Sequence, residues 1–513
     1  MRRVLPLFAG ASMLAALVIA GPQSSAAPVP TPEVTLPPIP AISGLPIPSL
    51  PTDLLVPKFI GAAAAKNPIS HPTIPQNPYL SPDGTNTMHN DAYASDAYKV
   101  SGPLGKNLKV SSASYGIREC ATIAFDSKNR IVGLCGGLEG FGMMVIDPVT
   151  LKPISELRTS ARNLATAANP FTDICGGTYF FLDKNDVAYP TTAKKTVLKI
   201  KVQADGTLIK QKEWSLADKV PASDCLIATM PDWKGRLWFF TQQGIVGTLN
   251  RTTGAIKTVH LPVGEEVTNS VSTDETGGMY VVSTHALYRL DATSSGTPKT
   301  TWRRTYDRGT RLKTGNLSQG SGTTPTLLGE KWVAINDNAD PKTNVLVYDR
   351  RKGVKSRLHC KQPTLAANAG TTDNSLVAAG NSFIIENNYG YGGPTTTILG
   401  QTTTPGLARV KVDKTGCHVA WTSDEIAPSS VAKASLGNGL LYAYTKPKQT
   451  DPLTNTLDAW YFTAIDIRTG KTKWSRLTGT GVQWNNHYAA IYLGPDGAAY
   501  IATLAGLVRI KDS

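Results

Sequence analysis

Two runs of acidic and amide side chains follow apolar segments of the sequence and are candidates for a binding site. Residues 336–340 read Asn-Asp-Asn-Ala-Asp, and residues 386–391 read Glu-Asn-Asn-Tyr-Gly-Tyr. Carboxylate and amide oxygens are the ligands that a hard cation such as calcium prefers. Amides beside aromatic rings also suit the hydroxyl groups of sugars and other polyols. The alternative is structural, because Asp and Asn are common in tight turns.

Further polar residues precede short apolar segments at regular intervals: Glu119, Asp173, Asp224, Asn269, Asp373, Asn374, Asn485, Asn486 and His487. The predicted ligand-binding set is Asp337, Asn338, Asn374, Glu386, Asn387, Asn388, Tyr389, Asn486 and His487. The predicted metal set is Asp337, Asp340 and Glu386, which suits calcium. His487 also fits a general base, with a structural histidine as the alternative. The sequence has no nucleophile elbow, P-loop or Rossmann glycine pattern in a suitable context.

A repeated hairpin pattern predicts the elements that position these residues. Two short apolar strands flank a turn rich in Asp, Asn, Gly or Lys, and this pattern occurs at 125–132, 182–188, 231–238, 273–280, 328–334, 379–385, 436–442 and 493–500. A second hairpin follows most of these segments, so each unit has four strands, as in a propeller blade. We therefore predict an all-β protein with a single eight-bladed β-propeller at 105–513. Seven blades, two smaller propellers or a sandwich are the alternatives.

The last unit is one strand short. The chain ends after Gly506–Lys511, whereas the strand-like residues 107–114 have no hairpin partner. We expect 107–114 to complete the last blade and close the ring, which removes an exposed sheet edge. Loops before the innermost strands and after the second strands then share one face around the axis. The candidate residues lie in these loops, as does the long segment 306–322, which is either an axial cover or a surface loop.

The segment 464–474 carries the pattern x-Asp-x-x-Thr-Gly-x-x-x-Trp and resembles the repeat of the quinoprotein alcohol dehydrogenase-like (PQQ-repeat-like) propeller superfamily. In that family the Trp packs between blades, so the resemblance implies core positions for Trp214, Trp302, Trp421 and Trp474. The chain also resembles uncharacterised exported actinobacterial propeller proteins. This resemblance implies a fold and an extracytoplasmic location but no reaction. The quinone-binding enzymes carry two adjacent cysteines, which this sequence lacks, so PQQ is not expected as a cofactor.

The N-terminus and the cysteines indicate export. Residues 1–27 combine a basic start, an apolar run and small residues, as in a signal peptide; an uncleaved anchor helix is the alternative. No later segment is apolar enough to span a membrane. The six cysteines favour disulfides over free thiols in an exported chain. We predict the pairs Cys120–Cys135, Cys175–Cys225 and Cys360–Cys417, and a secreted or cell-envelope location.

Residues 28–104 are expected to form a Pro-rich linker and a docking segment. There are 15 prolines between residues 28 and 82. His89, Asp91 and Asp96 have the spacing of metal ligands, but they lie outside the repeats, so we interpret them first as docking residues. The net charge of +14 falls within the propeller. For an exported protein it favours an anionic envelope polymer or lipid head groups over nucleic acid, and a soluble basic surface is the alternative.

These observations predict an exported β-propeller that binds a ligand or partner at its axial face and carries no recognisable catalytic motif. The partner is a small molecule or an envelope polymer, either anionic or a polyol. The alternative is a metal-assisted hydrolase, lyase or quinoprotein-like oxidoreductase with its site on the same face.

Overall fold

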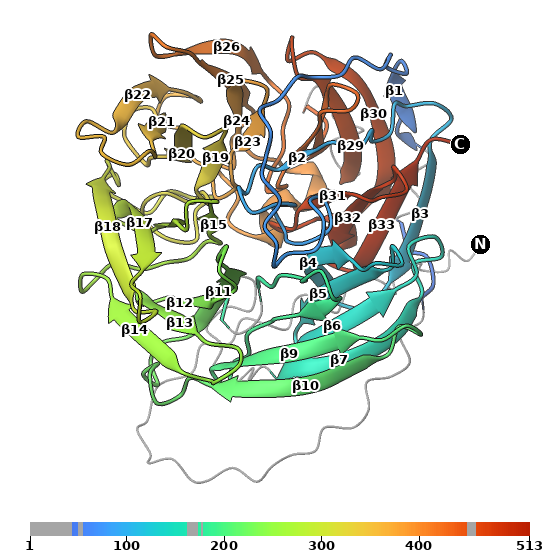
Figure 1. The fold of residues 1–513 in the computed structure, drawn as a ribbon. Helices are drawn as coiled ribbons and strands as arrows, with labels where there is room; N and C mark the ends of the chain where they lie inside the picture. Colours follow the sequence, from blue (N-terminus) through green and yellow to red (C-terminus); the bar gives the residue numbers. More distant parts are fainter. Residues whose placement is uncertain (1–43, 50–54, 162–172, 176–177, 449–457) are drawn as a thin grey trace, which may run out of the picture. The chain divides into compact units, whose positions relative to one another are not determined.

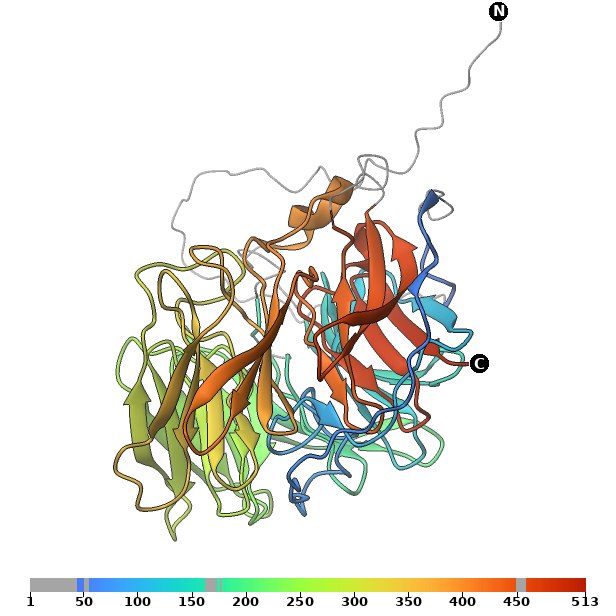
Figure 2. The ribbon, with the colours of Figure 1, turned by 90° about the horizontal axis from the view of Figure 1, so that it is seen from above.

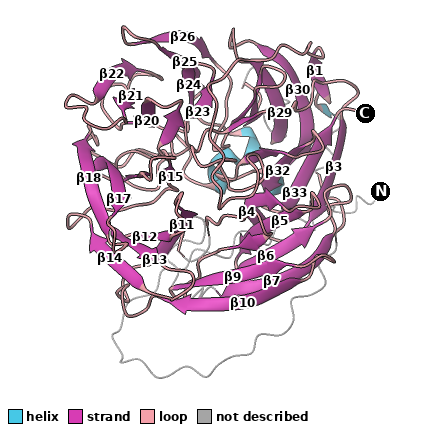
Figure 3. Cartoon of the chain, viewed as in Figure 1, coloured by secondary structure: helices cyan, strands magenta, loops and turns pink. Residues whose placement is uncertain are grey.

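The computed structural model describes residues 44–49, 55–161, 173–175, 178–448 and 458–513. All of them belong to one compact unit, Ile42–Ser513. This unit consists of eight β-sheets arranged around a central axis (Figure 1). The described residues are almost entirely strands and loops, with two short 3₁₀ segments, η2 (Pro394–Gly400) and η3 (Val482–Trp484) (Figure 3). The predicted all-β, eight-bladed propeller is confirmed, and the seven-bladed alternative is wrong.

Five blades are four-stranded sheets whose strands follow one another in chain order. Blade one consists of β4 (Arg118–Phe125), β5 (Ile131–Gly137), β6 (Gly140–Ile146) and β7 (Pro153–Ala161). Blade three consists of β11 (Leu226–Pro231), β12 (Leu237–Thr241), β13 (Ile245–Leu249) and β14 (Ile256–His260). Blade four consists of β15 (Ser272–Thr273), β16 (Met279–Val282), β17 (Ala286–Ala292) and β18 (Pro298–Thr305). Blade five consists of β19 (Thr326–Leu328), β20 (Trp332–Asn336), β21 (Asn344–Asp349) and β22 (Leu358–Pro363). Blade six consists of β23 (Val377–Ala379), β24 (Ser382–Glu386), β25 (Leu407–Val412) and β26 (Cys417–Ser423).

The other three blades depart from this pattern. Blade two has β8 (Val187–Ala188), β9 (Thr196–Val202) and β10 (Leu208–Ser215), and a single bridge from Leu182 to Ala188 marks its innermost position. Blade seven has β27 (Lys433–Ser435), β28 (Leu440–Thr445), β29 (Ala459–Asp466) and β30 (Thr472–Thr480), extended by β1 (Phe59–Gly61) and β2 (Ala97–Tyr98). Blade eight has β31 (Ile491–Leu493), β32 (Ala499–Thr503) and β33 (Gly506–Lys511), and β3 (Lys109–Ser114) pairs antiparallel with β33. The predicted closure of the ring by an N-terminal strand is therefore confirmed.

Acidic side chains stabilise the turns between the first two strands of several blades. Asp232 Oδ1 accepts the backbone N–H groups of Lys234 and Arg236 at 2.9 and 3.0 Å. Asp274 accepts those of Thr276 and Gly278, both at 3.0 Å. A carboxylate that bonds to its own turn in this way fixes the hairpin geometry. This local chemistry is what made the repeat visible in the sequence.

The predicted tryptophans are buried between blades. Trp474 is fully buried, and Trp214, Trp302 and Trp421 are 6 to 9% exposed. Trp421 on β26 donates its indole N–H to the carbonyl oxygen of Ile467, which lies in blade seven, at 2.8 Å. These positions agree with the packing that the resemblance implied.

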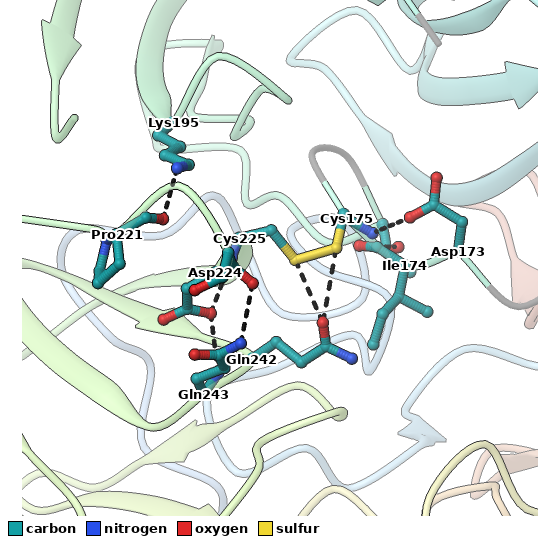
Figure 4. Close-up of a disulfide and its surroundings, with 11 residues drawn as sticks. Asp173, Ile174, Cys175, Lys195, Pro221, Asp224, Cys225, Gln242 and Gln243 are labelled. Carbon is teal, nitrogen blue, oxygen red and sulfur yellow. Dashed lines mark hydrogen bonds between the residues drawn. A yellow bond between two sulfur atoms is a disulfide. The ribbon is translucent and has the colours of Figure 1, made fainter. Parts of the chain in front are cut away.

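The three predicted disulfides are all present. Cys120–Cys135 joins β4 to β5 within blade one, and Cys360–Cys417 joins β22 to β26 in neighbouring blades. Cys175–Cys225 joins the loops before the innermost strands of blades two and three (Figure 4). The amide oxygen of Gln242 lies 3.7 and 3.6 Å from the two sulfur atoms of this bridge. Covalent links between blades constrain the ring in addition to its strand pairing.

Residues 62–104, here called the strap, lie against the propeller and cross the centre of the ring in Figure 1. The strap carbonyls of Thr85, Asn86, Ala92, Tyr93, Ser95 and Asp96 accept the backbone N–H groups of Phe125, Leu182, Thr273, Leu327, Ala378 and Ala434, respectively. The side-chain amide of Asn77 reaches Pro231 of blade three at 3.0 Å. The strap thus bonds to the inner part of seven blades. Its prolines are compatible with this path, since the strap has almost no ladder of its own.

The candidate metal ligands of the strap have partners within the protein. His89 Nδ1 lies 3.0 Å from Asp96 Oδ1, and His89 Nε2 lies 3.1 Å from Thr324 Oγ1 before β19. Asp96 also contacts Ser375 before β23 and Lys433 on β27. These contacts hold the strap to blades five, six and seven.

Candidate functional site

A cavity of about 150 Å³ lies at the axis, and we call it the axial cavity. It is lined by loops before several innermost strands, by residues of β4, β5 and β6 in blade one, and by Met88 and His89 of the strap. The lining residues used below are Glu119, Phe141, Tyr179, Asp373, Asn374, His487 and Tyr488. Because neighbouring strands are antiparallel, all loops before the innermost strands open at one end of the ring. The turns between the first and second strands lie at the other end.

Figure 2 shows these two ends from the side of the ring. The strap runs along one edge, and η2, which follows the second strand of blade six, lies at the opposite edge. The axial cavity therefore opens on the η2 side, and the strap closes the channel on the other side.

Two carboxyl groups of the axial cavity have raised pKa values. Burial raises the pKa of Asp373 to about 7, although the backbone N–H of Leu317 and the Asn316 amide oppose the shift. Burial also raises the pKa of Glu119 well above its ordinary value. The Oε1 atom of Glu119 is enclosed and has no hydrogen-bond partner among the described residues. A protonated carboxyl both donates and accepts hydrogen bonds, so each group can bind a neutral hydroxyl.

Asn374 connects the axial cavity to a third carboxyl group with a raised pKa. Its amide Nδ2 donates to Glu386 Oε1 and to the carbonyl oxygen of Ser430, the latter at 2.7 Å. Burial raises the pKa of Glu386 to about 8. Asn374 Oδ1 and Glu386 Oε2 are both enclosed and without a partner among the described residues. Unsatisfied buried acceptors are costly, and they mark a place where a ligand or water can bind.

His487 and Tyr488 contribute an unusual backbone to the wall of the axial cavity. Their φ angles are 26° and 64°, a region that side-chain-bearing residues rarely adopt. His487 Nδ1 lies 3.0 Å from the hydroxyl of Tyr391, and Tyr488 donates to the carbonyl oxygen of Gly315 at 3.2 Å. These contacts fix both rings at the cavity. Backbone held in such a region is common at functional sites.

The lining residues of the axial cavity include no lysine or arginine within the described part of the chain. The protein as a whole carries a net charge of +14. The cavity thus has the opposite character to the surface, with carboxyls, amides and the rings of Phe141, Tyr179 and Tyr488. An anionic group would find no lysine or arginine among these described lining residues.

The structure brings part of the predicted site together. Asn374 and His487 line the axial cavity, and Glu386 accepts a hydrogen bond from the Asn374 side chain. Asp173, Asn269 and Asp373, which precede innermost strands in the sequence, also line it, as does Glu119 at the start of β4.

The remaining predicted residues stabilise loops. Asp337 Oδ1 accepts the backbone N–H groups of Ala339 and Asn344 at 3.2 and 2.7 Å, which closes its own loop. Asn338 donates to the carbonyl oxygens of Arg308 and Arg311 at 3.0 and 3.2 Å, so it anchors the long segment 306–322.

Blade six shows the same use of amides. Asn387 donates to the carbonyl oxygens of Ala369 and Pro405 and accepts the backbone N–H of Tyr389. Asn388 Oδ1 accepts the backbone N–H of Asp373 at 2.8 Å, and this bond holds the loop that carries Asp373. In blade eight, Asn486 donates to the carbonyl oxygen of Ala489 at 3.0 Å. These residues shape the loops around the axial cavity.

The expected metal set is not brought together. Within the described residues, no three His, Cys, Asp or Glu side chains form a group that could hold a metal ion. Asp340 instead pairs with Lys313 at 3.0 Å, and Lys446 pairs with Asp458.

The sequence interpretation missed several residues of the axial cavity. Met88 and His89 come from the strap, and Tyr179 and Phe141 lie in segments without a polar run. Leu317 lines the cavity and belongs to the long segment 306–322. The length of this segment was a sequence signal that it could reach the axis.

Comparison with known proteins finds a distant relative among sequences and several solved structures of low similarity. No protein-family model matches this sequence. An uncharacterised protein of Archaeoglobus fulgidus is 26% identical over 317 residues, which cover 54% of this chain and 59% of the relative. The chain thus spans well under two thirds of the length of that relative.

Several solved structures are similar to the propeller at low identity. A virginiamycin B lyase of Staphylococcus aureus aligns with 67% of this chain and 96% of its own at 11% identity, with a TM-score of 0.41. The WD40 domain of fission-yeast SCAP aligns with 79% of this chain and 99% of its own at 9% identity, with a TM-score of 0.45. Within the described residues, no helix is long and apolar enough to cross a membrane. The structure itself establishes an eight-bladed β-propeller with three disulfides, and the predicted quinoprotein-like relationship stays a resemblance.

Proposed function

We propose that this protein is an exported propeller that binds a small neutral polyol, or a polyol unit of a larger envelope molecule, in its axial cavity. The observation that carries the proposal is the set of enclosed acceptors without partners, Glu119 Oε1 and Asn374 Oδ1. A ligand that supplies hydroxyl donors would satisfy them. The rings of Phe141, Tyr179 and Tyr488 supply apolar faces for the carbon skeleton of such a ligand.

The protonation of the carboxyl groups in the cavity favours a neutral ligand over a charged one. With raised pKa values, Glu119 and Asp373 carry less negative charge near neutral pH than ordinary carboxyls do. A cation would have to ionise them first, and an anion has no basic partner among the described lining residues. A polyol hydroxyl requires neither change.

Export is supported by the disulfides. Three disulfides are typical of proteins that fold in an oxidising compartment. The predicted signal peptide, residues 1–27, lies outside the described residues, and mass determination of the protein secreted by its host would test its cleavage.

Binding is tested by calorimetry with a panel of linear polyols, cyclitols and monosaccharides, beside a panel of primary amines, at about pH 6 and about pH 8. We expect saturable binding of a polyol at both pH values, because a hydroxyl can form a hydrogen bond with Asp373 whether this carboxyl is protonated or ionised. Glu119→Gln and Asp373→Asn should each weaken it by up to about tenfold, the effect of losing a hydrogen bond to a buried group. The matched control, Asp218→Asn, changes an exposed carboxyl away from the cavity and should leave affinity unchanged. Binding of amines alone, with affinity rising toward pH 8, would contradict the proposal.

A second candidate function is general acid–base catalysis in the same cavity. It is favoured by Asp373, because a carboxyl with a pKa of about 7 can both release and take up a proton near neutral pH. This candidate predicts that a bound polyol derivative, such as a glycoside or ester, is converted to product and that Asp373→Asn abolishes turnover while binding persists. Elemental analysis of the purified protein would show whether a metal takes part.

A further inference from the structure

A second groove lies at the opposite end of the ring from the axial cavity. It has a volume of about 760 Å³ and is lined by Ile69, Ser70, His71, Pro72, Gly380, Asn381, Arg409, Lys411 and Arg468. We call it the basic groove. Gly380 and Asn381 form the turn between β23 and β24, which places the groove on the strap side. The proposed polyol site is therefore separate from it.

The basic groove gathers positive charge, and the Asp466 carboxylate, which acts on Arg409, lies outside its lining. Its described lining includes Arg409 and Lys411 of β25 and Arg468 of the turn between β29 and β30, but no Asp or Glu. None of these three side chains forms an ion pair with another described residue at 4 Å or less. Basic groups that converge without carboxylates are suited to bind an anion.

Arg409 is held rigidly with one end free. The residue is 6% exposed; its Nε donates to Ser382 Oγ at 2.9 Å and its Nη1 to the carbonyl oxygen of Ile467 at 3.0 Å. Its Nη2 has no acceptor among the described residues. A Cβ atom placed on Gly380 would lie 3.8 Å from this Nη2, so the free end is beside the β23–β24 turn. A guanidinium fixed in this way offers its remaining donors without a further loss of side-chain entropy.

His71 contributes a second free donor at the same turn. Its Nδ1 accepts the backbone N–H of Gly380 at 3.1 Å, so the neutral ring carries its proton on Nε2. The Nε2 atom is enclosed and has no partner among the described residues. Burial, with a contribution from Lys99, lowers the pKa of His71 to about 4, so the ring is neutral near pH 7. A buried donor without an acceptor is costly unless a ligand occupies the site.

We propose that the basic groove is a binding site for a phosphate-type oxyanion, held by His71 Nε2, Arg409 Nη2, Lys411 and Arg468. The anion would accept hydrogen bonds from the two free donors beside Gly380, and Lys411 and Arg468 would neutralise its charge. Arg468 would act through its charge alone, because its Nη1 and Nη2 already donate to the strap carbonyls of Asn67 and Pro68 at 2.8 and 2.6 Å. Such charge-assisted bonds are short and strong. The same chemistry is carried by free phosphate, by a phosphomonoester and by a phospholipid headgroup.

Calorimetric titration of the full-length protein with inorganic phosphate in low-salt chloride buffer tests the site. We expect one saturable site per chain. Arg409→Gln should weaken binding by about tenfold or more and Lys411→Gln by several-fold, the range for losing a charged hydrogen-bond partner. The matched control is Lys414→Gln, an exposed lysine in the turn that follows β25 and outside the groove, which should leave affinity unchanged. Arg409→Lys retains the charge and shows whether any loss seen with Arg409→Gln reflects misfolding.

Vesicles distinguish the sources of the phosphate group. Co-sedimentation with phosphatidylcholine vesicles that contain phosphatidic acid, competed by inorganic phosphate, would identify a headgroup ligand. Binding of inorganic phosphate without co-sedimentation would identify a soluble phosphate compound. Absence of saturable phosphate binding by the folded protein, or equal weakening by Lys411→Gln and Lys414→Gln, would overturn the proposal. Neither result bears on the polyol site, because the tested variants lie at the other end of the ring.

Discussion

Lys433 on the innermost strand of blade seven forms an ion pair with Asp96 of the strap, and both side chains are fully buried at the centre of the ring. Burial alone would raise the pKa of Asp96, but Lys433 and His89 outweigh it, so this pKa lies below its ordinary value. The pair therefore joins two segments 337 residues apart in the sequence. It makes the strap part of the propeller core.

Breaking this pair should destabilise the protein strongly. Lys433→Met leaves Asp96 buried without its main cationic partner, for which we expect a loss of about 3–5 kcal/mol in the free energy of unfolding. The control is Lys448→Met, which removes an exposed ion pair with Asp424 and should cost less than about 1 kcal/mol. Chemical denaturation measures both. Equal effects of the two variants would show that the strap pair adds little.

The packing of the strap can be tested without changing a charge. A Cβ atom on Gly437 would lie 2.6 Å from the carbonyl oxygen of Lys99 in the strap, so Gly437→Ala should displace this segment at a cost of about 1–3 kcal/mol. The control, Gly392→Ala, meets only Thr396 Oγ1 and Thr314 Cγ2 at 3.3 and 3.7 Å. Limited proteolysis with N-terminal sequencing should find new cleavage sites near Lys99 in the first variant. A strap that stays protected in Gly437→Ala would argue against this packing.

Most of the fold was readable from the sequence because its determinants are local. Each first hairpin carries its turn chemistry within about eight residues, and an unpaired strand at 107–114 pointed to ring closure. The disulfides followed from that register. The strap was harder to predict because its bonds run from backbone carbonyls to inner strands of distant blades, and nothing in its proline-rich sequence encodes these partners.

The site could be predicted from the sequence only in part, because its side-chain contacts also depend on segments far apart in the chain. Position along the chain correctly placed Asp373 and Asn374 in the loop before an innermost strand, and this loop does line the axial cavity. Glu119 also lines it, but it lies at the start of the innermost strand β4 and not in the loop before it. Position does not tell whether an amide faces the cavity or its own loop. Asn338 and Asn387 donate their amide hydrogen bonds to backbone carbonyls of the loops that they anchor. The sequence alone does not predict these contacts, because they depend on the three-dimensional path of the loops.

The disulfides should differ in their contribution to stability. Cys360 and Cys417 are 57 residues apart and link two blades, whereas Cys120 and Cys135 are 15 apart within one blade. In the chain-entropy model, a double Cys→Ala variant should lose about 4 kcal/mol for the first pair and about 3 kcal/mol for the second. Guanidinium denaturation compares them. A larger loss for the shorter loop would show that native packing, and not the closed loop length, sets the contribution.

The protonation of Glu386 should make stability depend on pH. Burial raises its pKa from 4.5 to about 8, so between these values the folded protein binds more protons at this group than the unfolded chain does. Its contribution to stability is therefore complete below about pH 4.5 and is lost as the pH rises to about 8. Other groups also titrate in this window, and the burial of His71 acts in the opposite direction below pH 6.5.

The informative quantity is thus the difference in the free energy of unfolding between the wild type and Glu386→Gln, which keeps the shape of the side chain and stays neutral. We expect the stability of the wild type relative to this variant to fall from pH 5 to pH 8 by at most about 1.4 kcal/mol per pH unit. Urea denaturation at several pH values measures it, and a difference that does not change with pH would mean that Glu386 is ionised in the folded protein.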